Sequence, residues 1–191
     1  MKSNFLILTL TLLSSMAFGQ AQWKTDHSHS NIRFTITHML ITEVEGKFND
    51  FEATVSSEKD DFDGAEVDFT AKVVSIDTEN EKRDNHLKSD DFFSADKFPE
   101  IKFKGHIVKE GSKYFLKGDF TIRDVTKAVT FDVKYNGNLE GKRGRKAGFK
   151  VTGSINRFDY GLKWNNTVET GGLVVSEDVE ITCNIELNEI K

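Results

Sequence analysis

Apolar and polar residues alternate along most of the chain with a period of two. In the segment that begins at residue 32, Ile32, Phe34 and Ile36 alternate with polar residues. Such alternation is typical of a β-strand that buries one face. The same pattern recurs at residues 51–55, 67–73, 101–107, 114–122, 129–135, 149–155 and 179–187. The chain is therefore predicted to be an all-β protein of about eight strands.

Short polar segments separate the predicted strands. Asp63-Gly64, residues 110–112 and residues 142–146 are sequences that join antiparallel neighbours. Asn136-Gly137 interrupts an apolar pattern that continues to Leu139, so we interpret it as a β-bulge. A sheet of this size has two unpaired edges unless it closes on itself. We therefore expect a closed antiparallel up-and-down barrel.

One segment departs from this rhythm. Residues 79–87 are polar without a period of two, and Ser89, Asp90 and Asp91 follow them. Ser89 is a candidate N-cap residue, and the two aspartates suit the positive end of a helix dipole. We expect a short helical segment here that packs Phe92 and Phe93 onto the barrel and caps one end.

The N-terminal segment has the pattern of a secretory signal peptide. Residues 5–13 are almost all apolar, and the small residues Ala17 and Gly19 precede Gln20. The apolar run is much shorter than the roughly 20 residues that span a bilayer. Cys183 is the only cysteine, which argues against a lipid anchor and a disulfide framework. We expect residues 1–19 to be removed and residues 20–191 to form one periplasmic or secreted domain.

Charge and motifs exclude several classes of function. The formal net charge is −5, from 26 basic and 31 acidic residues, which does not suit a nucleic-acid partner. The chain contains neither a Gly-x-Ser-x-Gly elbow nor a His-Glu-x-x-His metal motif. We therefore expect a protein that is not an enzyme and carries no cofactor.

The interior of the barrel has two interpretations. The inward positions carry many phenylalanines, together with Gly105, Gly118 and Gly153. Glycines among large rings either leave a slot or mark bends in a filled core. The first arrangement is a container for an apolar molecule. The second is a solid barrel that acts as a protein-interaction module.

Several blocks of the sequence, in order, resemble the YceI-like family. They are residues 26–30, Gly46-Lys47-Phe48, residues 83–87, residues 98–103, residues 118–127 and residues 155–162. The resemblance spans essentially the whole chain after residue 20. It implies a lipocalin-like barrel that binds a polyisoprenoid, a quinone-type lipid or another long amphiphile in its lumen. Phe120 stands where the family usually has leucine, a change toward a narrower lumen.

The resemblance implies that the inward side chains are candidate ligand contacts. The expected lumen residues are Phe34, Ile36, Phe48, Phe69, Phe92, Phe93, Phe103, Phe120, Ile122, Phe131, Phe149, Ile155 and Ile181. Four polar residues, His38, Arg83, His86 and Arg157, are candidates to meet a ligand head group. The alternative for Arg83 and Arg157 is an ion-pair network that pins the helix to the barrel.

The sequence is compatible with more than one form of membrane contact and of oligomeric state. Residues 142–146 carry four basic side chains, which either touch anionic lipids during ligand loading or form a solvated hairpin tip. The oligomeric state is left open, a homodimer included.

A metal-dependent enzyme is the main rival hypothesis. His27, His29 and His38 lie in one region of the chain, and His27 and His29 share a strand face. Zinc sites usually draw ligands from more than one strand, so we prefer hydrogen-bonded structural histidines and expect no metal.

Overall fold

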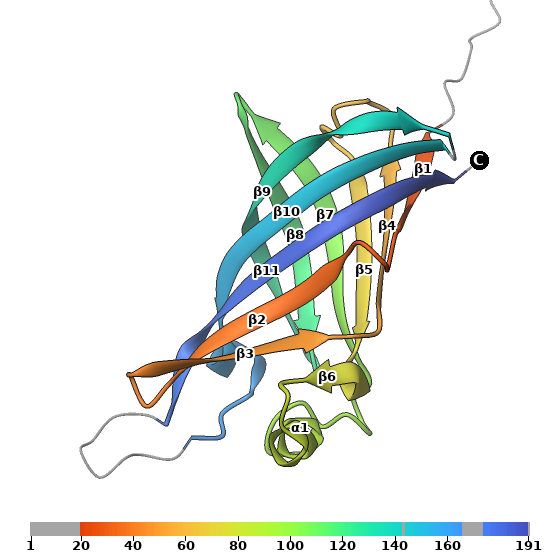
Figure 1. The fold of residues 1–191 in the computed structure, drawn as a ribbon. Helices are drawn as coiled ribbons and strands as arrows, with labels where there is room; N and C mark the ends of the chain where they lie inside the picture. Colours follow the sequence, from red (N-terminus) through yellow and green to blue (C-terminus); the bar gives the residue numbers. More distant parts are fainter. Residues whose placement is uncertain (1–19, 143, 166–173, 191) are drawn as a thin grey trace, which may run out of the picture.

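The computed structural model describes residues 20–142, 144–165 and 174–190, so the predicted signal peptide lies outside the described residues. Within these ranges a single sheet is surrounded by little other structure (Figure 1). Its strands are β1 (Ala21–Thr25), β2 (Asn31–His38), β3 (Thr42–Phe48), β4 (Phe51–Ser57), β5 (Glu66–Lys72), β6 (Ile76–Asp77), β7 (Glu100–Glu110), β8 (Lys113–Ile122), β9 (Val125–Gly141), β10 (Gly144–Asn156) and β11 (Val175–Ile190). The helix α1 (Glu81–Lys88) and the 3-10 turns η1 (Val73–Ser75) and η2 (Arg157–Tyr160) complete the described structure.

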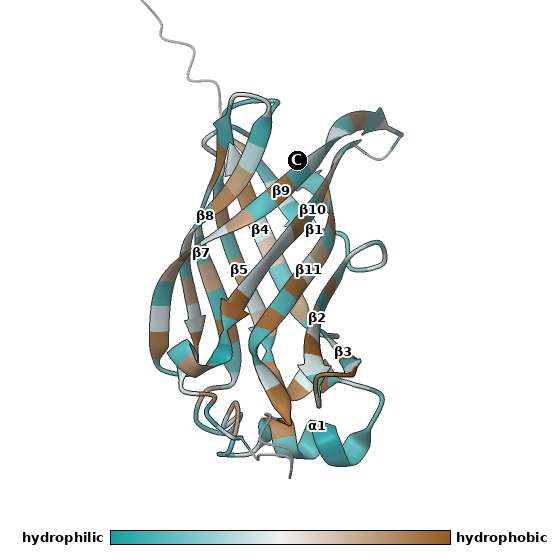
Figure 2. Ribbon diagram, turned by 90° about the vertical axis from the view of Figure 1, so that its left-hand side faces the viewer, coloured by the Kyte–Doolittle hydropathy of each residue, from teal (hydrophilic) through white to brown (hydrophobic). Residues whose placement is uncertain are grey.

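The sheet closes into an eight-stranded antiparallel ring, as the alternation predicted. The ring order is β1, β4, β5, β7, β8, β9, β10 and β11, and β1 pairs with β11 to complete it. Brown and teal residues alternate along these strands in Figure 2, as expected when one face is buried. The bulge is also confirmed: Gly148 pairs with Gly137 and Phe149 with Tyr135, which leaves Asn136 without a partner.

The closing strand is not the one that the pattern singled out. The segment around Phe34 forms β2, which pairs with β11 and with β3 but lies outside the ring. The shorter β1 precedes it and pairs with both β4 and β11. Consequently β2 and β3 extend from the barrel at one end, and β6 pairs with β3 at that same end (Figure 1).

The short helix also differs from the prediction in its boundaries. The side chain of Asn80 accepts a hydrogen bond from the Arg83 amide and caps the N-terminus of α1, whereas Ser89 is the C-cap residue. Ser89 as N-cap was therefore wrong, because the polar segment before it is itself the helix. The helix lies across the end of the barrel that β2 and β3 also border (Figure 1). No helix among the described residues is long and apolar enough to cross a bilayer.

An aromatic cluster fills the opposite end of the barrel. Phe62 is 0% exposed and packs 5.1 Å from Trp23, 5.0 Å from Phe149 and 5.6 Å from Tyr135, measured between ring centroids. Phe62 belongs to the loop between β4 and β5 and has a positive φ of 61°. The loop thus folds this ring inward, so the end of the barrel remote from α1 is closed by side chains.

Glycines allow several rings to lie flat against the wall. Gly153 of β10 lies beside the ring of Phe131 in β9, and a Cβ atom at Gly153 would lie 2.3 Å from that ring. A Cβ at Gly46 would lie 2.2 Å from the ring of its partner Phe34. These glycines therefore do more than bend strands: they make room for rings that would otherwise project into the lumen.

Phe62→Ala is expected to destabilise the protein by about 3–5 kcal/mol, because it removes a fully buried ring and leaves a cavity in the plug. Chemical denaturation monitored by circular dichroism measures the change. Leu139→Ala removes a large apolar side chain that is 62% exposed and serves as control, with an expected change within about 0.5 kcal/mol. Equal effects of the two substitutions would contradict the role of the plug.

Candidate functional site

The barrel encloses a cavity of about 570 Å³. This volume lies within the roughly 300–1,000 Å³ of typical small-molecule pockets. Side chains from β2, β3, β4, β5, β7, β8, β9, β10 and β11 line it, and almost all of them are apolar. The barrel interior is therefore not a filled core, which argues against the solid-barrel interpretation.

All thirteen predicted lumen residues lie on the cavity wall: Phe34, Ile36, Phe48, Phe69, Phe92, Phe93, Phe103, Phe120, Ile122, Phe131, Phe149, Ile155 and Ile181. Phe120 packs edge-on against Phe131 at 6.0 Å and Tyr160 at 5.8 Å. The ring is thus held at the wall. That these side chains contact a ligand stays a prediction.

The cavity mouth lies beside α1. Lys82, Arg83, His86 and Leu87 of this helix line the cavity, as does Trp164. The His86 ring packs edge-on against Phe92 at 5.0 Å and Trp164 at 5.2 Å. Apolar rings and polar side chains therefore meet at this end, as in a site for a molecule with an apolar chain and a polar head.

Arg83 and His86 are held in defined positions at the mouth. Arg83 donates from Nε to Thr78 Oγ1 at 2.8 Å and from Nη2 to the Thr78 carbonyl oxygen at 2.7 Å. The buried Asp84 carboxylate accepts from the amide and the hydroxyl of Thr78. His86 Nε2 lies 3.0 Å from Asp91 Oδ2. These contacts orient both side chains without using all the guanidinium donors.

Arg157 also borders the cavity, but its contacts are those of a structural residue. Its guanidinium donates to four backbone carbonyl oxygens: Leu162 at 2.5 Å, Trp164 and Ser176 at 2.8 Å, and Val175 at 3.3 Å. The side chain is 2% exposed, and burial lowers its pKa from the ordinary arginine value. Arg157 thus ties the segment after β10 to the start of β11.

Cys183 faces the cavity from β11. Burial raises the pKa of its thiol to about 12. The thiol is therefore protonated at neutral pH and is a poor nucleophile. The structure agrees with the inert thiol that its alternation with Ile181 and Ile185 indicates.

The three histidines of the rival metal hypothesis do not come together. His38 ends β2 and lines the cavity, whereas His29 lies just before the other end of this strand. The eight residues of β2 span roughly 26 Å at about 3.3 Å per residue, so His29 and His38 lie at opposite ends of this length. His27 instead lies 3.5 Å from Glu52. These histidines cannot bind one ion.

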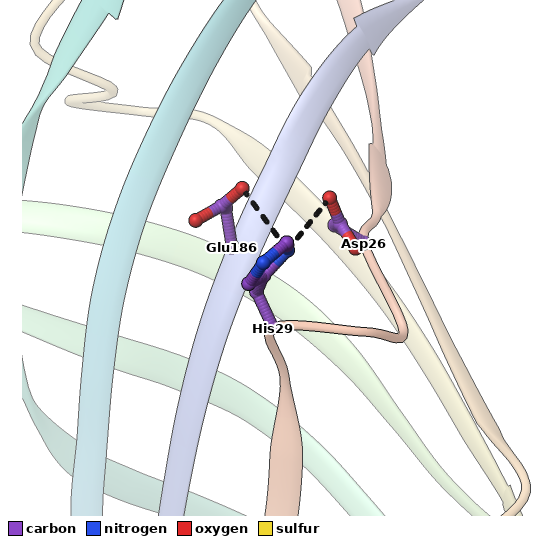
Figure 3. Close-up of side chains that lie close together, drawn as sticks. All are labelled: Asp26, His29 and Glu186. Atoms are coloured by element: carbon purple, nitrogen blue, oxygen red, sulfur yellow. Dashed lines mark ion pairs between the residues drawn. The ribbon is translucent and has the colours of Figure 1, made fainter.

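His29 belongs to a different cluster, between Asp26 and Glu186 (Figure 3). Its Nδ1 atom lies 3.2 Å from Asp26 Oδ2 and 3.7 Å from Glu186 Oε1. The potential ligand atoms of the three residues lie within 4.8 Å of one another. However, the Lys146 ammonium already bridges the carboxylates, at 3.1 Å from Asp26 and 2.5 Å from Glu186.

This cluster therefore forms an ion-pair network rather than a metal centre. A hydrogen bond from the Ser28 hydroxyl, together with Lys146 and His29, holds the pKa of the Asp26 carboxyl well below its ordinary value. The network fastens the turn between β1 and β2 to β10 and β11.

Comparison with known proteins places this geometry in a family. The model of the YceI-like domain matches residues 23–187. The chain belongs to the YceI-like family. A UPF0312 protein of Staphylococcus aureus (strain MSSA476) is 38% identical over 167 residues, which cover 85% of this chain and 95% of the relative.

Solved structures share the family's barrel. The Campylobacter jejuni YCEI protein is 33% identical, with a TM-score of 0.69 over 82% of this chain and 91% of that one. Burkholderia cenocepacia BcnA has a TM-score of 0.73 at 22% identity, over 85% and 98% of the two chains. A polyisoprenoid binding domain from Saccharophagus degradans has a TM-score of 0.65 at 11% identity, over 88% and 98%. At the two lower identities the likeness concerns the fold alone.

Two aromatic residues important to the YceI-like cavity were missed in the sequence. Trp164 lies in a polar segment without periodicity, and Phe62 lies between two aspartates that indicate an exposed turn. A large ring in a polar turn was the available signal in both cases, because exposed turns seldom need such a side chain.

Arg157→Met is expected to destabilise the protein by at least about 3 kcal/mol, because it leaves several buried carbonyl oxygens without a donor. Urea denaturation measures the loss. Arg33→Met makes the same chemical change at an exposed position of β2, where we expect a change within about 0.5 kcal/mol. A mild effect at Arg157 would show that its hydrogen bonds are dispensable.

The Asp26 network is expected to stabilise the protein in a pH-dependent way. Because folding lowers the pKa of Asp26, the stabilisation is complete above its unfolded pKa of about 3.9 and decreases as the pH falls toward the folded pKa. Asp26→Asn should therefore lower the unfolding midpoint more at pH 7 than at pH 3. Asp124→Asn, at an exposed carboxyl, is the control. A pH-independent difference for Asp26→Asn would contradict this assignment.

Proposed function

We propose that this protein is an exported carrier that holds a polyisoprenoid, a quinone-type lipid or a similar long-chain molecule in the barrel, without chemical turnover. The observation that carries the proposal is the apolar cavity, which an aromatic plug closes at one end and α1 borders at the other. An apolar chain gains free energy when it leaves water for such a wall, without any polar contact. The polyisoprenoid binding domain from Saccharophagus degradans shares this barrel, which adds support to the proposal.

The polar groups at the mouth support a ligand with a small head. Arg83 and His86 are positioned by Thr78 and Asp91, and His38 lies at the end of β2 on the same cavity. Arg157 has its donors bound to carbonyl oxygens, so Arg83 and His86 are the stronger candidates for head-group contact.

The chemistry of the wall supports binding without turnover. Among the described residues that line the cavity there is no aspartate, glutamate or serine. The one thiol, Cys183, has a pKa raised to about 12 by burial. General acid–base and nucleophilic catalysis need groups that ionise near neutral pH or are activated by a neighbouring base. Among the described lining residues the histidines His38 and His86 are such groups, and both lie at the mouth rather than on the apolar wall that would hold the chain.

The first residues of the chain support an exported location for the proposed carrier. The apolar segment at residues 5–13, with small residues before Gln20, supports export to the periplasm or the medium. Edman sequencing of the protein recovered from the periplasm or medium tests this, and an N-terminus near Gln20 is expected.

Organic extraction of the purified protein, followed by mass spectrometry, tests the cargo. We expect a long-chain lipid in the extract, and uptake of added ubiquinone or geranylgeraniol by the stripped protein. An extract without such a lipid, combined with no uptake of either compound, would overturn the carrier proposal.

A side chain that fills the lumen should abolish this uptake. Cys183→Trp places a large ring inside the cavity, and we expect ubiquinone affinity to fall by at least about tenfold while the barrel stays folded. Asn184→Trp adds the same ring to the outer face of β11, since neighbouring strand residues face opposite ways, and should bind normally. Fluorescence titration measures both. Equal binding by the two variants would place the ligand elsewhere.

A further inference from the structure

The most exposed cluster of apolar side chains lies at the turn between β2 and β3. Met39, Leu40 and Ile41 are consecutive and are 43%, 72% and 81% exposed. Single exposed apolar residues are common on proteins, but three in sequence at the tip of a projecting hairpin are not. We refer to residues 39–41 as the apolar tip.

The backbone of the apolar tip makes these residue types unfavourable. Ile41 donates its amide to the His38 carbonyl at 3.2 Å, which closes a hairpin turn around Met39 and Leu40. Both central residues have positive φ, 52° and 64°. Such turns favour Asn-Gly, because bulky side chains are strained in the left-handed region. Turn stability therefore does not explain Met-Leu, and strain of this kind points to a functional constraint.

The apolar tip lies at the mouth of the cavity. His38, directly before the tip, lines the cavity, and so does Val174. The Met39 amide donates to the Val174 carbonyl at 2.9 Å. Figure 1 shows the turn between β2 and β3 at the same end of the barrel as α1. Residues 142 and 144–146, the described part of the predicted membrane contact, instead fall at the end remote from α1, where Arg145 and Lys146 are paired with carboxylates.

We propose that the apolar tip inserts into the surface of a lipid bilayer and docks the cavity mouth there. The proposal rests in part on the proposed function, because a long-chain apolar ligand resides in membranes and must reach the mouth from one. A tip of three residues is too small for a stable dimer interface, which needs about 20–30 residues from each partner. Burial of three such side chains supplies enough free energy for reversible docking at a bilayer surface.

Vesicles without cargo test docking separately from ligand binding. Leu40→Ser/Ile41→Ser is expected to weaken binding to phosphatidylethanolamine/phosphatidylglycerol vesicles by about tenfold or more, since burial of one such side chain is worth on the order of tenfold. Flotation assays measure the partition constant. Leu139→Ser, which changes a similarly exposed leucine in β9 at the other end, should bind as the wild type does.

A second variant separates docking from stability. Met39→Asn/Leu40→Gly supplies the residues that this turn favours, so we expect the melting temperature to rise by about 2 °C or more. The same variant should lose vesicle binding. Unchanged vesicle binding in either tip variant, or no vesicle binding by the wild-type protein, would overturn the proposal. A tip variant that only converts a dimer to a monomer would overturn it too.

Ligand measurements complete the experiment. Uptake of ubiquinone from detergent solution should be unchanged in both tip variants, because residues 39–41 do not line the cavity. Transfer of ubiquinone between vesicles should slow by about the same factor as vesicle binding weakens. If the wild-type protein takes up no ubiquinone from detergent but still binds vesicles through the tip, docking stands and the carrier function fails.

Discussion

Pairing of the short β1 with two strands is the interaction on which the rest of the structure depends. β1 hydrogen-bonds to β4 on one side and to the C-terminal half of β11 on the other. The Thr25 hydroxyl donates a hydrogen bond to the Ala53 carbonyl oxygen at 3.0 Å and accepts one from the Ala53 amide at 2.8 Å. Without this strand the sheet would have two free edges, and the inner face would not enclose a volume.

Only one half of the barrel is closed in this way. β1 and β2 run in the same direction along β11, joined by the turn at residues 26–30. Past that turn, the partner of β11 is β2, and β2 continues to β3 instead of β4. The network of Asp26, His29, Lys146 and Glu186 lies at this change of partner and holds it in place. One fold feature thus produces both a closed end and a mouth.

The two ends differ in chemistry as well as in closure. At the closed end, Phe62, Trp23, Tyr135 and Phe149 fill the interior with rings. At the mouth, polar side chains from α1 meet Phe92 and Trp164. Between them, rings such as Phe131 lie flat over glycines and leave the middle of the barrel hollow. This change from an aromatic closed end to a polar mouth suits a ligand that enters with its apolar chain first.

The sequence by itself determined eight of the strands, the closed barrel and many of the side chains that line it, whereas β1, β3 and β6 were not predicted. Alternation is local: a period of two sends every second residue inward wherever the strand is placed, so Phe34, Phe103 and Ile181 could be assigned to the inner face in advance. Blocks such as residues 118–127 identified the family for a similar reason: they are continuous runs of sequence that can be compared without knowing which strands pair.

Only the tertiary structure decided whether the inner face encloses a filled core or a cavity, which strand closes the ring, and what Arg157 and Phe62 do. Each of these depends on partners distant in sequence: the carbonyls of Val175 and Ser176 for Arg157, and Trp23 and Phe149 for Phe62. The composition of a strand limits the volume of its side chains. The space left between them depends on how rings and glycines of facing strands are brought into register, and that is set when the sheet closes.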